Sequence, residues 1–188
     1  MIDISSALTI PGWMEPDELE YLAHAASKSP RIVEIGSWQG RSARALVDNT
    51  DGVVICVDTW DNSAVGIKGW WRGEQVPEEW QKDDWLYRLF CENLKDVLFE
   101  RVFPIRVNSL RAAKERPPSK ADFIFIDADH SYEAVKADIL AWRKHLAPNG
   151  ILAGHDYGFP DYPGVKQAVD ELVGPVRVIN TIWTTEAI

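Results

Sequence analysis

Five short, largely apolar runs constrain the fold of this chain more than any other feature of its sequence. A strand exposed on one face alternates apolar and polar residues, whereas these runs are nearly continuous, which is typical of parallel strands covered on both faces. Segments with apolar residues at helical spacing separate the runs. The alternation predicts an α/β fold, in which helices cover both faces of a mostly parallel sheet. The five runs occupy residues 31–35, 53–57, 102–107, 121–126 and 151–154.

The remaining segments complete this pattern. Residues 176–185 are typical of a strand with a closing hairpin around Asn180, which brings the expected sheet to six or seven strands. The 188 residues suit one domain, residues 1–188, arranged as a Rossmann-like three-layer sandwich. Residues 60–82 are irregular and form a candidate lid, because long loops in compact domains are usually functional or mobile. Helices are expected at residues 16–27, 42–48, 83–98, 132–146 and 164–173.

Charge and cysteine content limit the partners and the compartment. The formal net charge is −9, and an acidic surface repels phosphate backbones, so we expect no nucleic-acid partner. The sequence shows no secretory leader and no run near the roughly 18 apolar residues of a membrane span. The two cysteines, Cys56 and Cys91, suggest neither a disulfide framework nor a zinc site. We therefore expect a cytoplasmic protein that does not bind membranes.

Polar residues follow all five runs at the point where each predicted strand ends. One such ending is commonplace, because strands end in turns, but parallel strands bring their carboxyl ends to one edge of the sheet. Ligands of open α/β sheets bind outside that edge, so the sequence predicts a site there. The residues delivered to it are Glu34 and Gly36, then Asp58, then Asn108 and Ser109, then Asp127, Asp129 and His130, and finally His155 and Asp156.

The loop after the first run contains glycine but does not suit a dinucleotide. Gly36 permits a tight turn and the close approach of a ligand. A dinucleotide-binding loop needs a glycine where Trp38 stands, so that the backbone can approach a pyrophosphate. S-adenosylmethionine, which carries no phosphate, fits such a loop better. Asp58, 22 residues after Gly36, could bind ribose hydroxyls in either class of enzyme, so an NAD-dependent oxidoreductase stays as an alternative.

Four motifs, in this order along the chain, resemble those of class I S-adenosylmethionine-dependent methyltransferases. The closest group is methyltransferase domain family 24, which is related to macrocin-type sugar O-methyltransferases and more distantly to catechol O-methyltransferases. The resemblance covers residues 30–185 and implies a Rossmann-like fold with S-adenosylmethionine as methyl donor. The motifs are Val33-Glu-Ile-Gly-Ser-Trp-Gln-Gly-Arg-Ser42, Val57-Asp-Thr-Trp60, Phe125-Ile-Asp-Ala-Asp-His-Ser-Tyr132 and Gly154-His-Asp-Tyr157.

The resemblance implies a role for each motif residue. Asp58 would bind the ribose of the cofactor, while Trp60 and Ser109 would lie near its adenine. Asp127 corresponds to a carboxylate that, in the metal-dependent relatives, binds a divalent cation beside the cofactor. His130 corresponds to a histidine proposed as the general base in the sugar O-methyltransferases. The amino-acid part of the cofactor would be held by Glu34, Gly36, Ser37 and Gly40.

The expected cation site comprises Asp127, Asp156 and His155. The sulfonium is already a good electrophile, so the enzyme must mainly align the acceptor hydroxyl and remove its proton. A metal lowers the pKa of a hydroxyl, and a histidine can accept the proton. Mg²⁺ prefers oxygen ligands, whereas a histidine ligand suits softer ions. Two alternatives stay open: Asp127 and Asp156 as loop-capping acids of a metal-free enzyme, and His130 as a helix-terminal residue that contacts only cofactor.

Tryptophan is unusually abundant, with nine residues in the chain. Trp70 and Trp71 predict an aromatic lid over the cofactor and acceptor. Alternatively, Trp80 and Trp85 open an amphipathic helix and pack in the core, as we expect of Trp142 in its own helix.

Together these features predict an O-methyltransferase that acts on a small hydroxylated molecule, such as a sugar or a phenol. N-methylation stays open. So does a non-catalytic cofactor-binding module, although the intact set Asp127, His130 and Asp156 argues against it. An exposed tryptophan patch would favour a homo-oligomer.

Overall fold

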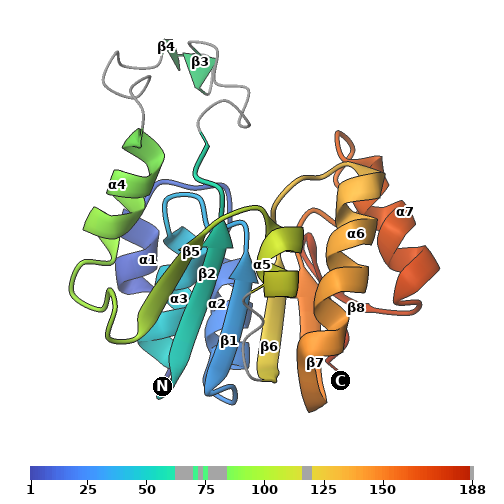
Figure 1. The fold of residues 1–188 in the computed structure, drawn as a ribbon, viewed down its shortest axis with the longest axis horizontal. Helices are drawn as coiled ribbons and strands as arrows, with labels where there is room; N and C mark the ends of the chain where they lie inside the picture. Colours follow the sequence, from blue (N-terminus) through green and yellow to red (C-terminus); the bar gives the residue numbers. More distant parts are fainter. Residues whose placement is uncertain (62–69, 72–73, 76–83, 116–119, 187–188) are drawn as a thin grey trace.

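A seven-stranded sheet runs through the computed structural model, which describes residues 1–61, 70–71, 74–75, 84–115 and 120–186 (Figure 1). The strand order is β5-β2-β1-β6-β7-β9-β8. The structure confirms the predicted Rossmann-like α/β fold and sets the strand number of this sheet at seven. Its strands are β1 (Arg31–Ile35), β2 (Val53–Asp58), β5 (Val102–Arg106), β6 (Ala121–Ile126), β7 (Leu146–Gly154), β8 (Arg177–Ile179) and β9 (Ile182–Thr184).

The strand order reverses at β1, and this reversal locates the ligand edge of the sheet. Strands β5, β2, β1, β6 and β7 are parallel, whereas β9 pairs antiparallel with both β7 and β8. The chain builds outward from β1 to β5 and then crosses to the other side of β1 with β6. The crevice at such a reversal, outside the carboxyl ends of the strands, is where open α/β sheets bind their ligands.

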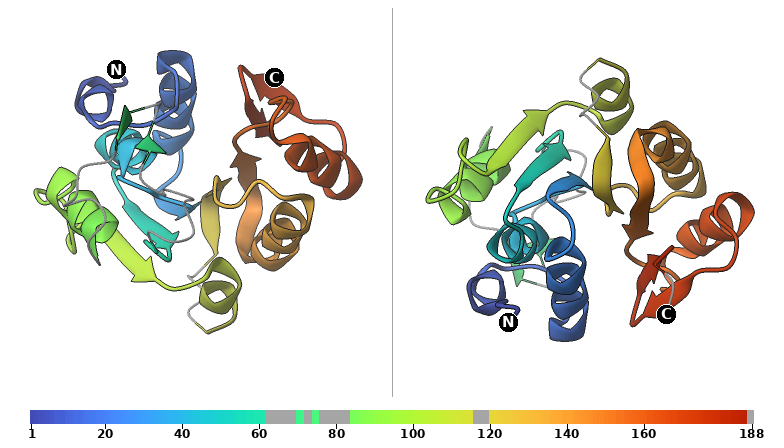
Figure 2. Two further views of the ribbon diagram at one scale, coloured as in Figure 1. Left: turned by 90° about the horizontal axis from the view of Figure 1, so that it is seen from above. Right: turned by 90° about the horizontal axis from the view of Figure 1, so that it is seen from below.

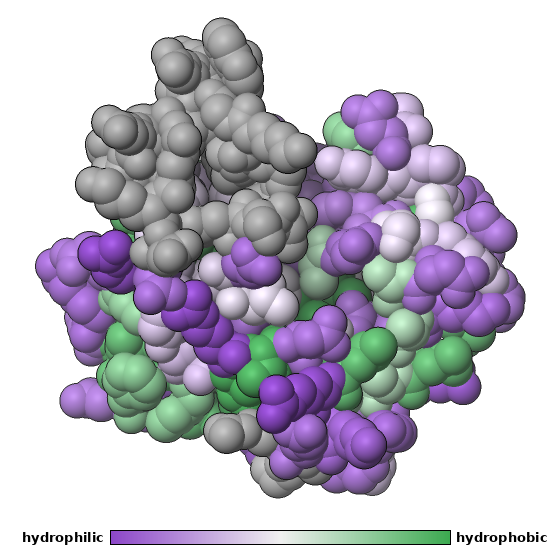
Figure 3. Space-filling model, turned by 45° about the horizontal axis from the view of Figure 1, so that its top comes forward, coloured by the Kyte–Doolittle hydropathy of each residue, from purple (hydrophilic) through white to green (hydrophobic). Residues whose placement is uncertain are grey.

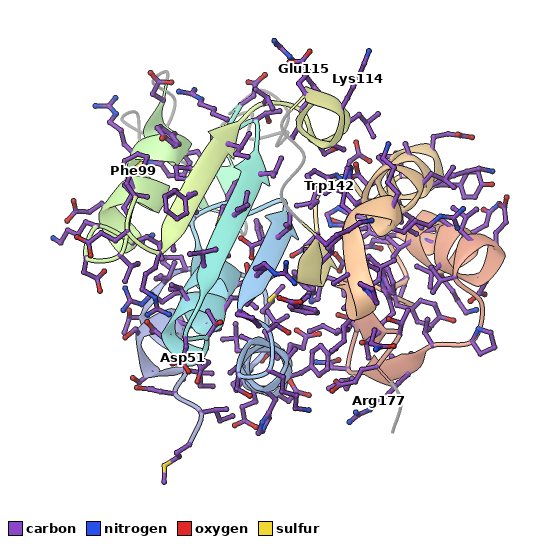
Figure 4. All side chains as sticks on the ribbon, turned by 60° about the horizontal axis from the view of Figure 1, so that its bottom comes forward. Asp51, Phe99, Lys114, Glu115, Trp142 and Arg177 are labelled. Carbon is purple, nitrogen blue, oxygen red and sulfur yellow. The ribbon has the colours of Figure 1, made fainter. Side chains whose placement is uncertain are left out.

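Helices cover both faces of the sheet, and each face encloses an apolar core (Figure 2). Side chains of α1 to α4 pack on one face, and side chains of α5 to α7 pack on the other. Trp142 of α6 is fully buried, as expected (Figure 4). The helices are α1 (Ser5–Thr9), α2 (Pro16–Ala26), α3 (Arg41–Asn49), α4 (Trp85–Asn93), α5 (Ser109–Glu115), α6 (Tyr132–Trp142) and α7 (Pro163–Leu172).

Two helices are shorter than the sequence predicts. The helix expected over residues 83–98 is α4, which follows Asp84 in a left-handed conformation and gives way to turns before Phe99, also left-handed. The helix expected over residues 132–146 ends at Trp142 and tightens into a 3₁₀ turn, Arg143–His145. It ends there because Leu146 already pairs with Ala121, so β7 begins five residues earlier than the expected run at 151–154.

Three features were not predicted: helices α1 and α5, and a short antiparallel pair, β3 (Trp70–Trp71) with β4 (Glu74–Gln75). Both helices are short, with five and seven residues, and so give little periodic signal. None of the described helices combines the length and the apolar character that crossing a membrane would require. Apolar patches interrupt a mostly hydrophilic surface (Figure 3). The exposed apolar side chains include Phe103 and Leu110.

Candidate active site

The loop after β1 passes so close to the end of β6 that its first residue must be glycine. Gly36 has a φ of 86°, in the left-handed region. A Cβ added to it would lie 1.9 Å from the carbonyl oxygen of Asp127. The backbone N–H of Asp127 in turn donates to Ile35. The predicted cofactor loop and the predicted metal-binding acid are therefore in direct contact.

Asp58 joins this loop to the end of β2. Its carboxylate accepts hydrogen bonds from the backbone N–H groups of Ser37 and Trp38, both at 2.9 Å, and of Trp60 at 2.7 Å. Burial raises the pKa of Asp58, and these N–H groups oppose that rise. The structure thus brings Asp58 to the glycine loop, as the sequence predicts, and gives it a loop-ordering role in addition to the expected ribose contact.

Glu34 lies in β1, just before the loop, and is fully buried. Burial raises its pKa to about 7, while the hydroxyls of Ser37 and Ser42 act in the opposite direction. Gly40, with a φ of 89°, ends the loop and begins α3. A side chain at Gly40 would press on Leu94. Of the four residues expected to hold the amino-acid part of the cofactor, Gly36, Ser37 and Gly40 therefore share one loop, whereas Glu34 lies in β1 just before it.

Trp60 is a core residue in this structure, 1% exposed. Its indole packs on Tyr87 and Phe90, with ring centroids 5.1 and 4.7 Å away, and its Nε1 donates to the carbonyl of Trp38. The Trp60 side chain thus supports the glycine loop through its hydrogen bond to Trp38. Contact between its ring and an adenine stays a prediction.

Ser109 begins α5 and donates its hydroxyl hydrogen bond to Asp138 of α6. Burial raises the pKa of Asp138 to about 6, against the lowering effect of this hydroxyl. The sequence analysis missed Asp138, although an acid within an otherwise apolar stretch of helix was a usable signal. The pair connects two helices on the same face of the sheet.

Two acids and two histidines meet where β6 and β7 end. The Nε2 atom of His130 lies 2.9 Å from Asp156 and 3.6 Å from Asp127. The Nδ1 atom of His155 lies 3.2 Å from Asp156 and 3.6 Å from Asp127. The residues that the sequence assigned to base and metal roles therefore form one acid–histidine cluster: Asp127, His130, His155 and Asp156.

Glu18 of α2 completes the cluster from behind, and the sequence analysis missed it. Its Oε2 lies 3.2 Å from Nε2 of His155, and the side chain is 2% exposed. Spacing could have found it, because Glu18 stands on the apolar face of α2, one turn before the buried Leu22. Both ring nitrogens of His155 thus lie within 3.6 Å of carboxylate oxygens.

These contacts shift the pKa values within the cluster. Burial would lower the pKa of His130, but Asp127 and Asp156 outweigh it and raise the value to about 9. For His155 the same competition raises the pKa to about 12. Burial would raise the pKa of Asp127, yet the two histidines hold it well below its usual range. The cluster therefore balances carboxylate charge with imidazolium charge.

The ring of His130 is held from its other side by an aromatic residue. Tyr162, just before α7, stacks on it with ring centroids 4.2 Å apart and an interplanar angle of 17°. Gly164 lets α7 approach the same segment, since a Cβ there would lie 2.4 Å from the backbone nitrogen of Tyr132. Asp129 is exposed, and its carboxylate accepts a hydrogen bond from the backbone N–H of Ser131 in the turn before α6.

Comparison with known protein families is decisive for the class of protein. A family model described as a methyltransferase domain matches residues 33–157, which hold all four motifs of the sequence analysis. The chain belongs to this methyltransferase family. The resemblance to methyltransferase domain family 24 is thereby confirmed, and the oxidoreductase alternative no longer applies.

Individual relatives of this methyltransferase domain are distant. A protein described as uncharacterized, y4gI of Sinorhizobium fredii, is 28% identical over 141 residues, which are 72% of this chain but only 14% of that relative. The chain thus spans a small part of that relative's length. Among solved structures, the SAH-bound methyltransferase PaMTH1 of Podospora anserina is 18% identical, with a TM-score of 0.65, and covers 92% of this chain and 78% of its own.

A second solved structure has a named reaction. CalS11, a TDP-rhamnose 3'-O-methyltransferase of calicheamicin biosynthesis, is 18% identical, with a TM-score of 0.59. The match covers 88% of this chain and 75% of CalS11. At such identities these likenesses establish the fold alone.

The methyltransferase domain offers a metal-sized group of ligand atoms. One ligand atom each from Asp127, His130 and Asp156 lies within 4.8 Å of the others. Asp127 and Asp156 come together as expected, and the third ligand atom of this group comes from His130. The ligand role expected for His155 stays a prediction. Two carboxylates and an imidazole fit a divalent cation, and the nitrogen donor favours ions softer than Mg²⁺.

Most residues of the candidate lid lie outside the part of the chain that the structure describes. These are residues 62–69, 72–73 and 76–83, which include Trp80. The backbones of Trp70 and Trp71 form β3. Trp85 opens α4 and is buried in the core, in agreement with the alternative given for it.

Proposed function

We propose that this domain transfers a methyl group from S-adenosylmethionine to a hydroxyl of a small molecule. The observation that carries the proposal is the contact between Gly36 and Asp127, which places the acid–histidine cluster against the cofactor loop. A donor held by that loop would present its methyl group toward a polar cluster able to accept a proton. Family membership supports the methyl-transfer step, and the cluster supports a hydroxyl as acceptor.

For the cofactor, we propose that the loop of Gly36, Ser37 and Gly40 holds the amino-acid end, with Glu34 in β1 just before it. Asp58 is already aligned by backbone N–H groups and is proposed to accept the ribose hydroxyls. Trp60 and Ser109 are proposed to border the adenine side, Trp60 by shaping the loop.

In the proposed reaction, the acceptor oxygen attacks the methyl carbon, and the bond from that carbon to the donor sulfur breaks, which releases S-adenosylhomocysteine. The acceptor proton moves to Nδ1 of His130, because Nε2 faces Asp156 and donates its hydrogen to that carboxylate. Asp156 orients the imidazole, and Tyr162 holds the plane of the ring by stacking. His130 must be neutral to accept a proton. In the free protein the carboxylates of Asp127 and Asp156 favour its protonated form, because they raise its pKa. A divalent cation held by Asp127 and Asp156 would supply positive charge that lowers the pKa of the acceptor hydroxyl.

The same proposal includes expectations about the acceptor, the compartment and the partners. The acceptor is a small molecule such as a sugar or a phenol, and an amine would fit a cluster able to accept a proton as well. We propose a cytoplasmic setting, which the unpaired Cys56 and Cys91 fit, and no nucleic-acid partner. Homo-oligomer formation stays a prediction.

The testing experiment measures cofactor binding first. Titration calorimetry with S-adenosylhomocysteine, in EDTA and then with Mg²⁺ or Mn²⁺, should give micromolar binding, with a change on metal addition if the cation site forms. A panel of sugars and phenols with radiolabelled S-adenosylmethionine should then reveal the acceptor class. The absence of S-adenosylhomocysteine binding in every buffer would overturn the proposal.

A further inference from the structure

The buried carboxylate of Glu18 is fixed by more contacts than a helix cap requires. Its Oε2 accepts a hydrogen bond from the N–H of Glu15 at 2.9 Å, which completes a capping box at the start of α2. Its Oε1 accepts two more, from the backbone N–H and the hydroxyl of Thr181, at 3.1 and 2.7 Å. With these donors in place, Oε2 still faces Nε2 of His155 at 3.2 Å.

The bonds of Glu18 to Thr181 join α2 to the β8–β9 hairpin, but this junction does not require Glu18. Tyr21, one turn further along α2, already hydrogen-bonds Thr184 of β9 at 2.6 Å. That bond involves no residue of the acid–histidine cluster. Glu18 uses both carboxylate oxygens as acceptors, and the oxygen that caps α2 is also the one that lies 3.2 Å from Nε2 of His155.

The contacts form a continuous chain from Glu18 to His130. Glu18 faces one ring nitrogen of His155, the other ring nitrogen lies 3.2 Å from Asp156, and Asp156 lies 2.9 Å from His130. Carboxylates and imidazoles alternate along it, so each group has an oppositely charged or hydrogen-bonding neighbour.

The backbone of Asp156 is held as well as its side chain. Its φ of 60° lies in the left-handed region. Its flanking residues are tied on both sides: the N–H of His155 donates to Ile126, and the N–H of Tyr157 donates to Thr181. Thr181 thus contacts Glu18 through its N–H and hydroxyl and the Asp156 turn through its carbonyl. Thr181 therefore holds both the strained turn at Asp156 and Glu18, the residue beside the His155 ring.

We infer that Glu18 is a positioning residue of this site, which fixes the direction of the Asp156 carboxylate through His155. His155 is accordingly an intermediary and not a ligand, and Asp156 is aimed at His130 and at a cation. The inference rests on the proposed function for its consequence, but the contact chain itself can be tested without a reaction.

The first test compares ring-nitrogen NMR signals of the four histidines at a single pH, without metal, in the wild type and two variants. Glu18→Gln keeps the size of the side chain, and Tyr21→Phe is the matched control on the same helix. We expect Glu18→Gln to shift the signals of both His155 and His130, and Tyr21→Phe to shift neither. His24, exposed on α2, reports any general disturbance of the helix.

The second test measures Mn²⁺ binding by electron paramagnetic resonance. Residues that orient metal ligands typically contribute about tenfold or more to affinity, so Glu18→Gln should weaken Mn²⁺ binding by about that factor while S-adenosylhomocysteine binding stays unchanged. If Glu18→Gln proves too unstable, Thr181→Val, which removes one hydroxyl bond to Glu18, should produce the same changes at smaller size.

The outcomes separate this inference from the proposed function. His130 signals and Mn²⁺ affinity in Glu18→Gln that match those of Tyr21→Phe would overturn the positioning role, whatever the cofactor results. A wild type that binds no Mn²⁺ would remove the metal part of the proposed function, and the histidine signals would still decide about Glu18. A wild type that binds no S-adenosylhomocysteine would remove the proposed function alone.

Discussion

Replacing Gly36 by alanine should damage both stability and cofactor binding, for two separable reasons. The first is backbone strain: a non-glycine residue in the left-handed region costs about 1–2 kcal/mol. The second is the clash, because the new Cβ would lie 1.9 Å from the carbonyl oxygen of Asp127 and 2.8 Å from the Cα of Ala128. Both neighbours are backbone atoms at the end of a central strand, so the loop itself must move by about 1 Å.

Gly174 provides a matched control for this substitution. Its φ is 90°, close to that of Gly36, but a Cβ there would meet no atom within 4 Å. Gly174→Ala therefore carries the strain without the clash and should lose roughly 3–6 °C in Tm, with unchanged S-adenosylhomocysteine affinity. Gly36→Ala should lose a further 1–3 kcal/mol or so from overpacking, which adds roughly 3–10 °C.

The assay pairs thermal melts with calorimetric titration of S-adenosylhomocysteine. Displacement of the loop should weaken binding in Gly36→Ala by about tenfold or more, equal to about 1.4 kcal/mol. Equal melting temperatures and equal affinities in the two alanine variants would refute the argument that the loop is held against β6.

Three further substitutions test separate parts of the site. His130→Gln should reduce kcat by about 10²–10⁴ with the acceptor that the screen identifies, with Mn²⁺ and S-adenosylhomocysteine binding retained; lost Mn²⁺ binding would instead make His130 a ligand. Asp58→Asn places an amide against the N–H groups of Ser37 and Trp38, and should weaken S-adenosylhomocysteine binding by about tenfold, whereas Asp51→Asn, at an exposed position, should not. Because the pKa of Glu34 is raised to about 7, the folded state holds a proton that the unfolded state releases near its ordinary value of 4.5, so stability falls as pH rises between these values. Glu34→Gln removes that loss. At about pH 8 its free energy of unfolding should exceed that of the wild type by up to roughly 3 kcal/mol, with a higher Tm, whereas at about pH 4 the two proteins should melt alike. Equal differences in Tm at both pH values would contradict the burial argument.

The strand ends were predictable because parallel topology alone brings them together. Apolar runs identified each strand, and the residue after each run was read directly, so Asp127, His130, His155 and Asp156 could be assigned to one edge of the sheet. Their division of roles was not predictable, because it depends on distances within the cluster. The ligand role that the sequence analysis gave to His155 stays a prediction: its Nδ1 lies near Asp127 and Asp156, and its Nε2 lies near Glu18.

Contacts made by helices were harder to predict. Glu18 and Asp138 reach their partners only after α2 and α6 have docked, and the sequence separation between Glu18 and Thr181 is 163 residues. Periodicity shows that such an acid faces inward but does not show which side chain it meets. Trp60 illustrates the reverse case, because its place after β2 suggested a ligand contact while its neighbours Tyr87 and Phe90 enclose it.

The location of Glu18 and Thr181 has a consequence for how this family can diversify. The family model spans residues 33–157, so Glu18, which lies beside His155, and Thr181, which hydrogen-bonds Glu18, are both outside the part of the chain that the model matches. Substitutions there could retune the charge around the acids while every recognisable motif stays intact. We therefore expect relatives with identical motifs to differ in metal preference or pH optimum where the residues at the positions of Glu18 and Thr181 differ.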